Sequence, residues 1–162
     1  MLKKPISRNE HMKKLSREHH FSLLFCWKVR QGLKMNVAME RIWKYVQYFW
    51  QQHLQPHFRE EEKTFFAPIK DRMVQRAINE HKLIKRQIEG LGIGSGNNER
   101  KNLAKIADMV YEHVRYEERD LFPHLEKKLS KEQLEDIGEQ IDKHQQSSLQ
   151  DQYEDQFWNT KQ

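Results

Sequence analysis

Apolar side chains recur at every third or fourth position along several long stretches of the chain, as they do on the buried face of an α-helix. In the first stretch Leu23, Cys26 and Val29 share one such face. Ser16 can cap the amino end of this first helix, and the helix is expected to stop near Gly32.

Three further long helices are expected after the first. The second should cover about 36–66, and Pro56 lies within its apolar pattern. A kink or local break is expected there, because proline lacks the backbone N–H and crowds the preceding turn. The third helix is expected over 71–89. The fourth should run over 99–118 and beyond, until Pro123 bends or ends it.

A short fifth helix is expected near the end of the sequence. Residues 130–133 read Ser-Lys-Glu-Gln, a capping box in which the two outer side chains bond each other's backbone N–H groups. The helix should reach about His144. The tail beyond it is polar, but Tyr153, Phe157 and Trp158 can dock on the bundle through their rings.

Long helices joined by short connections predict an all-α fold, an up-down-up-down four-helix bundle with a short C-terminal helix and tail. A length of 162 residues suits one domain. The single domain is expected over 1–162, with a bundle core over about 15–130 and the C-terminal helix and tail over 131–162. Residues 1–14 are polar and expected to be irregular, and 90–96 form a glycine-rich loop.

The composition agrees with this fold and narrows the function. No run approaches the roughly 18 apolar residues of a membrane span, and no signal peptide is recognisable. The net charge is +5, but basic and acidic residues are mixed along the chain, which is typical of solvated helix faces rather than a nucleic-acid interface. Cys26 is the only cysteine, which excludes an internal disulfide and favours a small core residue. We expect a cytoplasmic protein.

An internal repeat carries the chemistry. Residues 57–63 read His-Phe-Arg-Glu-Glu-Glu-Lys, and 113–119 read His-Val-Arg-Tyr-Glu-Glu-Arg. A Glu-His pair precedes each motif on the helix before it, at 18–19 and at 80–81. The chain therefore repeats one pattern, in which Glu-His on one helix is followed by His-x-x-x-Glu on the next.

This spacing has a physical use. Residues four apart lie one turn apart on the same helix face, so His57 and Glu61 can point at one site, as can His113 and Glu117. Imidazole and carboxylate together suit iron, zinc or manganese. Helices that each direct such ligands toward the bundle axis are the way di-iron carboxylate bundles are built. Two bridging glutamates would also offset the metal charge in an apolar core.

The order of these residues resembles the hemerythrin-type HHE cation-binding domain, over about 15–130 of the chain. The resemblance implies a four-helix bundle holding two irons, bridged by carboxylates and by an oxo or hydroxo group. It implies Glu61 and Glu117 as the bridging ligands. The full set of metal ligands that it implies is His19 (or His20), His57, Glu61, His81, His113 and Glu117.

The first helix offers two adjacent histidines. The repeat aligns His19 with His81, because each follows a glutamate. His19 also shares a helix face with Leu15 and Cys26, which favours it over His20. His53, one turn before the second-helix motif, is a further histidine that could contribute, although such a residue is more often a solvated neighbour.

The chain departs from oxygen-carrying hemerythrins in two places. Those proteins have a fifth histidine one turn after the third-helix ligand, where this chain has Lys85. They also use an aspartate five residues after the fourth-helix histidine, whereas here Glu117 is four residues on and Glu118 five. The resemblance is closer to sensing and repair HHE domains. It implies binding of, or response to, iron and small ligands such as O₂ or NO, in sensing, scavenging or redox chemistry rather than O₂ transport.

Two other interpretations stay open from the sequence. One is a mononuclear or zinc-loaded site with a hydrolytic role. Oxo-bridged ferric iron absorbs in the near ultraviolet and zinc does not, so an absorption spectrum would distinguish this site from a di-iron centre. The other is a metal-free basic helical module that binds a macromolecule. That module predicts salt-dependent binding and no effect of chelators.

Overall fold

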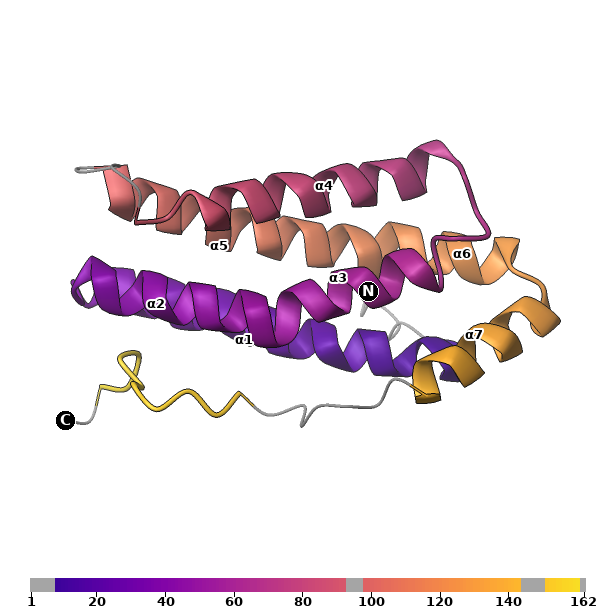
Figure 1. Ribbon diagram of the computed structural model, residues 1–162, viewed down its shortest axis with the longest axis horizontal. Helices are drawn as coiled ribbons and strands as arrows, with labels where there is room; N and C mark the ends of the chain where they lie inside the picture. The colour runs from indigo at the N-terminus through magenta and orange to yellow at the C-terminus, as the bar shows by residue number, and fades with distance from the viewer. Residues whose placement is uncertain (1–7, 93–97, 144–150, 161–162) are drawn as a thin grey trace, which may run out of the picture.

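The computed structural model describes residues 8–92, 98–143 and 151–160, and within these the protein is all-helical with no strand. Four long rods pack antiparallel, and a further helix and a tail lie against one side (Figure 1). This arrangement confirms the predicted four-helix bundle with a C-terminal helix. No helix in the described ranges is long and apolar enough to cross a membrane.

The first rod begins earlier than the sequence predicts. A short 3₁₀ turn, η1 (Glu10–Met12), leads directly into α1 (Lys13–Lys34). The Asn9 side chain accepts a hydrogen bond from the backbone N–H of the η1 segment and so starts the helix. The predicted cap at Ser16 is therefore wrong, because Ser16 lies inside α1, where its Oγ accepts from Arg8 Nε at 3.2 Å.

The second rod is continuous through its proline. It consists of α2 (Met39–Phe49), the π-helical turn η2 (Trp50–Leu54) and α3 (Gln55–Lys63). The N–H of Gln55 donates to the carbonyl five residues earlier, so the wide turn lies immediately before Pro56. The predicted local break is thus a widened turn, and the helix continues beyond it.

The third rod is α4 (Arg72–Glu89), as predicted. Asp71 caps it, with its side chain accepting from Val74 N at 3.0 Å. The loop predicted over 90–96 follows α4, and its residues 93–96 lie outside the described part of the chain.

The fourth rod comprises α5 (Glu99–Tyr116), the π-helical turn η4 (Glu117–Leu121) and α6 (Phe122–Lys128). As in the second rod, a π-helical turn is followed by a helix with a proline in its first turn, here Pro123 in α6. Pro123 therefore does not end the fourth rod, which continues to Lys128.

The last helix, α7 (Lys131–Lys143), starts with the predicted capping box. Ser130 N donates to Gln133 Oε1 at 2.9 Å, and Gln133 N donates to Ser130 Oγ at 3.1 Å. The predicted end at His144 lies outside the described residues. Gly138 of α7 packs against His11, so closely that a side chain there would collide with the ring.

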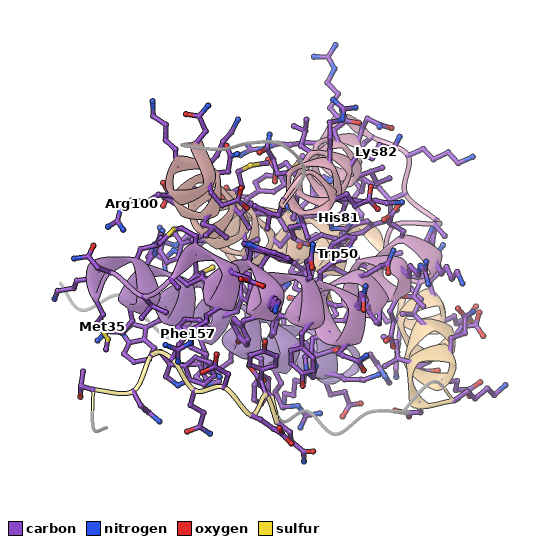
Figure 2. All side chains as sticks on the ribbon, turned by 60° about the vertical axis from the view of Figure 1, so that its left-hand side comes forward. Met35, Trp50, His81, Lys82, Arg100 and Phe157 are labelled. Atoms are coloured by element: carbon purple, nitrogen blue, oxygen red, sulfur yellow. The ribbon has the colours of Figure 1, made fainter. Side chains whose placement is uncertain are left out.

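The C-terminal tail docks through its aromatic residues, as predicted. Phe157 and Trp158 are buried, and Figure 2 shows Phe157 on the inner side of the tail, toward the helices. Gly32 makes room for this ring, because a Cβ at that position would lie 2.6 Å from Phe157 Cε2. Lys28 and Asp151 form a buried ion pair at 2.9 Å that joins the tail to α1.

The apolar core has two parts, which meet at a level where every rod carries buried polar residues. In α1, for example, Leu15 belongs to one part and Phe25 to the other, and His19 lies between them. In α4, Ala77 and Ile84 occupy the corresponding places. The bundle therefore encloses a polar layer at its centre.

Candidate metal centre

Six ionisable side chains form the middle of this polar layer, and each is exposed over at most 4% of its surface. An ionised group buried to this extent costs several kcal/mol unless it is paired or coordinated. The six are the residues singled out by the repeat: His19, His57, Glu61, His81, His113 and Glu117.

All four rods contribute to this layer. His57 and Glu61 lie one turn apart on α3, with their side chains on the same face. His113, near the end of α5, and Glu117, the first residue of η4, repeat this arrangement on the fourth rod. α1 and α4 each add one histidine, so helical spacing alone brings imidazole and carboxylate together from every side.

The six side chains form two groups that share both glutamates. In the first group, His19 and His57 join Glu61 and Glu117; in the second, His81 and His113 join the same two. Within each group one ligand atom per residue lies within 4.8 Å of all the others. The chain thus forms two adjacent, overlapping sites of the kind that hold a pair of metal ions.

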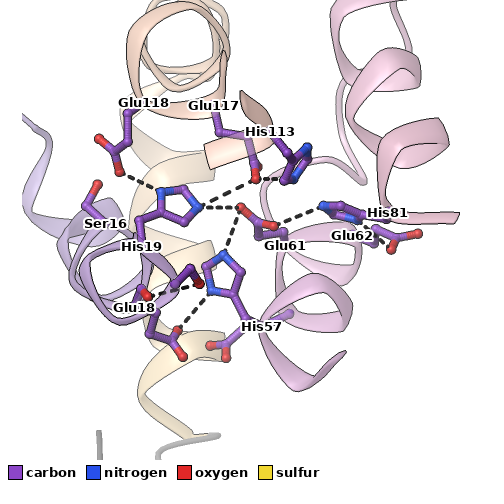
Figure 3. A network of polar contacts seen from close by, with 12 residues as sticks. Ser16, Glu18, His19, His57, Glu61, Glu62, His81, His113, Glu117 and Glu118 are labelled. Carbon is purple, nitrogen blue, oxygen red and sulfur yellow. Dashed lines mark hydrogen bonds and ion pairs between the residues drawn. The ribbon is translucent and has the colours of Figure 1, made fainter. Parts of the chain in front are cut away.

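The two oxygens of Glu61 face different groups. Oε2 lies 3.4 Å from His57 Nε2, and Oε1 lies 3.3 Å from His81 Nε2 (Figure 3). Glu117 also lies between histidines of the two groups, but through a single oxygen, with Oε1 2.6 Å from His113 Nε2 and 3.5 Å from His19 Nε2. Each carboxylate is therefore placed between two imidazoles that belong to different groups.

The atoms that face the centre contact one another only as ion pairs, and none of them makes a hydrogen bond to a described residue. They are the Nε2 atoms of all four histidines and both carboxylate oxygens of Glu61 and Glu117. Buried polar atoms are nearly always paired, so a cluster of this size needs an occupant. Metal ions would satisfy all of these lone pairs at once, and imidazole with carboxylate suits iron, zinc or manganese.

The far side of two histidines is held by the residue that follows a shared glutamate. His19 Nδ1–H donates to Glu118 Oε1 at 2.7 Å, and His81 Nδ1–H donates to Glu62 Oε2 at 3.0 Å. A carboxylate on Nδ1 keeps the proton there, which leaves the Nε2 lone pair directed at the centre.

The glutamates of the Glu-His pairs serve the other two histidines. His113 Nδ1–H donates to Glu80 Oε1 at 2.7 Å. Glu18 Oε1 lies 3.5 Å from His57 Nδ1, an ion-pair contact longer than a hydrogen bond. We call Glu18, Glu62, Glu80 and Glu118 the outer carboxylates.

Sequence reasoning assigned none of the four outer carboxylates to an individual histidine. The signal was nevertheless present, since the repeat contains Glu-His and Glu-Glu in both halves. What the sequence does not contain is the pairing, because each outer carboxylate serves a histidine of a different rod.

The structure brings His19 into the centre and leaves its neighbour outside. The His19 ring lies between both shared glutamates and stacks on Phe122, at a centroid distance of 5.1 Å. His20 is exposed and touches only the Phe21 ring among the described aromatic contacts. His53 packs against aromatic rings of its own rod, outside both groups.

Without a metal, the groups hold protons on histidine beside ionised glutamate. Burial alone would lower the pKa of His57, but Glu61 raises it to about 10. Burial likewise opposes a charge on His113, and Glu117 raises its pKa to about 9. The pKa of Glu61 is lowered well below its usual range, because His57 outweighs the cost of burial. A metal ion must therefore displace these protons to bind.

Comparison with known proteins supports this geometry. Residues 16–125 match the sequence model of the family described as the Hemerythrin HHE cation binding domain. No curated protein and no solved structure matches the chain. The matched segment covers more than half of the sequence and contains all six buried residues. The chain therefore belongs to the hemerythrin HHE cation-binding family.

Proposed function

We propose that this protein binds two iron ions in the centre of the bundle, and that it binds or responds to small ligands such as O₂ or NO there. The observation that carries the proposal is the sharing of Glu61 and Glu117 by two buried histidine groups. In this proposal the two glutamates bridge the metals, and the terminal ligands are His19, His57, His81 and His113.

The donor set supports iron. Each metal would have two imidazoles and two shared carboxylates, a set of nitrogen and oxygen donors that iron accepts in both of its common oxidation states. Bound iron would supply redox chemistry and a position for a small ligand. The residues of the chain supply the charge balance, because two carboxylates offset part of the metal charge in a buried site.

The surrounding side chains hold the proposed ligands rigid and dry. Phe58 stacks on the His81 ring at a centroid distance of 3.8 Å, and Phe122 stacks on His19. Arg8 Nη2 donates to Glu118 Oε2 at 2.7 Å, which fixes the outer carboxylate of His19. Such contacts exclude bulk water and prevent the imidazoles from turning away.

The third rod supports a role other than oxygen transport. Lys85 stands one turn after His81, where carriers of this family have a fifth histidine. Its side chain is half exposed, and its Nζ lies 3.9 Å from Glu89 Oε1. With four histidines, at least one iron would keep a further open position, which suits sensing, scavenging or redox chemistry.

Iron loading tests the ligand set. Ferrous reconstitution without oxygen should give about two irons per chain, and chelation should lower the melting temperature, because the metal binds only the folded state. His81→Ala and Glu61→Ala should each reduce the iron content, the glutamate more strongly because it serves both metals. His20→Ala, an exposed neighbour, is the matched control. Stoichiometric zinc from iron-supplemented culture, or no metal at all, would contradict the proposal.

Outer carboxylates provide a second test. Glu118→Gln and Glu62→Gln should each weaken metal affinity about 10- to 100-fold, as loss of a ligand's supporting carboxylate does in other metal sites. Glu60→Gln is the control, since Glu60 lies beside these residues but pairs with Lys14 Nζ at 3.2 Å. Competition against a chromophoric chelator measures the affinities, and equal effects in all three variants would refute the assignment.

The pH dependence of stability should differ between the metal-free and the iron-loaded protein. In the metal-free protein, the raised pKa values of His57 and His113 contribute stability that is fully present below pH 6.5 and is lost as pH rises through about 9 to 10. Metal binding needs neutral imidazoles, so the stabilisation by iron should grow over the same range. Urea unfolding of both forms measures this, and parallel profiles would count against it.

Oxygen cycling separates the proposed role from transport. The ferrous protein exposed to air should oxidise and stay oxidised after oxygen is removed, because an open position admits water and oxidant to the metal. Absorption spectra over repeated cycles provide the measurement. A change that appears with oxygen and fully disappears without it, cycle after cycle, would restore the carrier interpretation.

A further inference from the structure

A basic groove of about 600 Å³ lies on the outside of the bundle, and its lining includes Tyr116, the residue directly before Glu117. The amino-terminal half of α4 forms one wall, and the end of α5 with η4 and α6 forms the other. The residues that line it are Arg72, Met73, Arg76, Tyr116, Arg119, Asp120, Pro123, His124 and Lys127.

Most of the charge in this groove is positive and unpaired. Arg72, Arg119 and Lys127 are exposed, and none has an acidic partner within the described ranges. His124 is paired, through Nε2, with the Asp71 carboxylate at 2.6 Å. Asp120 is the one carboxylate of the lining, so cations of both walls outweigh it.

Arg76, on the α4 wall of the groove, is held in place by two contacts. Its guanidinium carbon lies 3.8 Å from the centroid of the Tyr116 ring, and Tyr116 Oη donates to the Met73 carbonyl at 2.8 Å. Its Nε donates to Glu80 Oε2 at 2.9 Å, while the two Nη atoms have no acceptor among the described residues. A stacked guanidinium with free donors is well suited to bind the oxygens of a phosphate group.

Glu80 connects this arginine to the metal centre. Its Oε2 accepts from Arg76, and its Oε1 accepts from His113 Nδ1 at 2.7 Å. An anion that draws the Arg76 guanidinium away from Glu80 would leave more of the Glu80 carboxylate charge to act on the His113 imidazole. His113 would then be a stronger donor toward the centre.

We propose that this groove binds a phosphate group, as free phosphate or a phosphate monoester, between Arg72, Arg76 and Arg119, and that its binding is coupled to the metal centre through Glu80. A doubly charged group with several acceptor oxygens fits a groove lined by several cations better than a single carboxylate does. Binding itself is independent of the proposed function, and only the coupling rests on it.

Equilibrium dialysis of the full-length protein with labelled inorganic phosphate tests the binding. The double variant Arg72→Gln/Arg119→Gln should lose about tenfold or more in affinity, in both metal-free and iron-loaded protein. The control Lys101→Gln/Lys105→Gln removes the same charge from exposed positions outside the groove and should bind as the parent does. Parallel dialysis with glycerol phosphate shows which source is preferred, because a monoester site favours it over free phosphate.

Three outcomes would overturn the proposal. Equal losses in both double variants would mean that the overall charge of +5 attracts the anion. Binding that requires iron would place phosphate on the metal. A phosphate-induced shift in the near-ultraviolet spectrum that persists in Arg76→Gln would refute the coupling. Failure of iron loading alone leaves the groove result intact, so the two proposals fail separately.

Discussion

The structure depends on one constraint, the burial of four histidines and two glutamates in the middle of an apolar bundle. No single helix can satisfy these groups. Each rod has to place its polar residues at the same height as those of the others, with apolar side chains above and below. The register of the rods and the chemistry of the centre are therefore aspects of the same requirement.

The outer carboxylates extend this requirement to the whole bundle. Glu118 of the fourth rod holds a histidine of α1, and Glu62 of the second rod holds one of α4. Glu80 of α4 holds one of α5. Because each contact joins two rods, the residues that orient the proposed ligands also cross-link the helices. A metal ion in the centre would stabilise the fold through these same links.

The sequence predicts most of this, because helical periodicity places residues on faces without tertiary information. Spacing of four identifies His57 with Glu61, and the repeat favours His19 over His20. The Ser16 cap failed for a tertiary reason: Met12 is fully buried, so the helix extends to carry it into the core. The capping propensity of a single residue could not reveal the stabilisation that comes from burying Met12.

Contacts between rods were beyond the sequence for the same reason. Which outer carboxylate serves which histidine, and which arginines meet in the basic groove, depends on how the rods pack. Both prolines illustrate the limit as well. Pro56 and Pro123 predict a disturbance, and the structure resolves it as a π-helical turn that preserves the rod.

Electron paramagnetic resonance of the oxidised, iron-loaded protein tests the central claim most directly. If Glu61 and Glu117 bridge the two metals, the ferric ions are coupled and the spectrum should show no signal from isolated high-spin iron. Reduction by one electron should then produce the signal of a coupled mixed-valence pair. A signal of isolated ferric ions that accounts for all of the bound iron would contradict the shared-carboxylate centre.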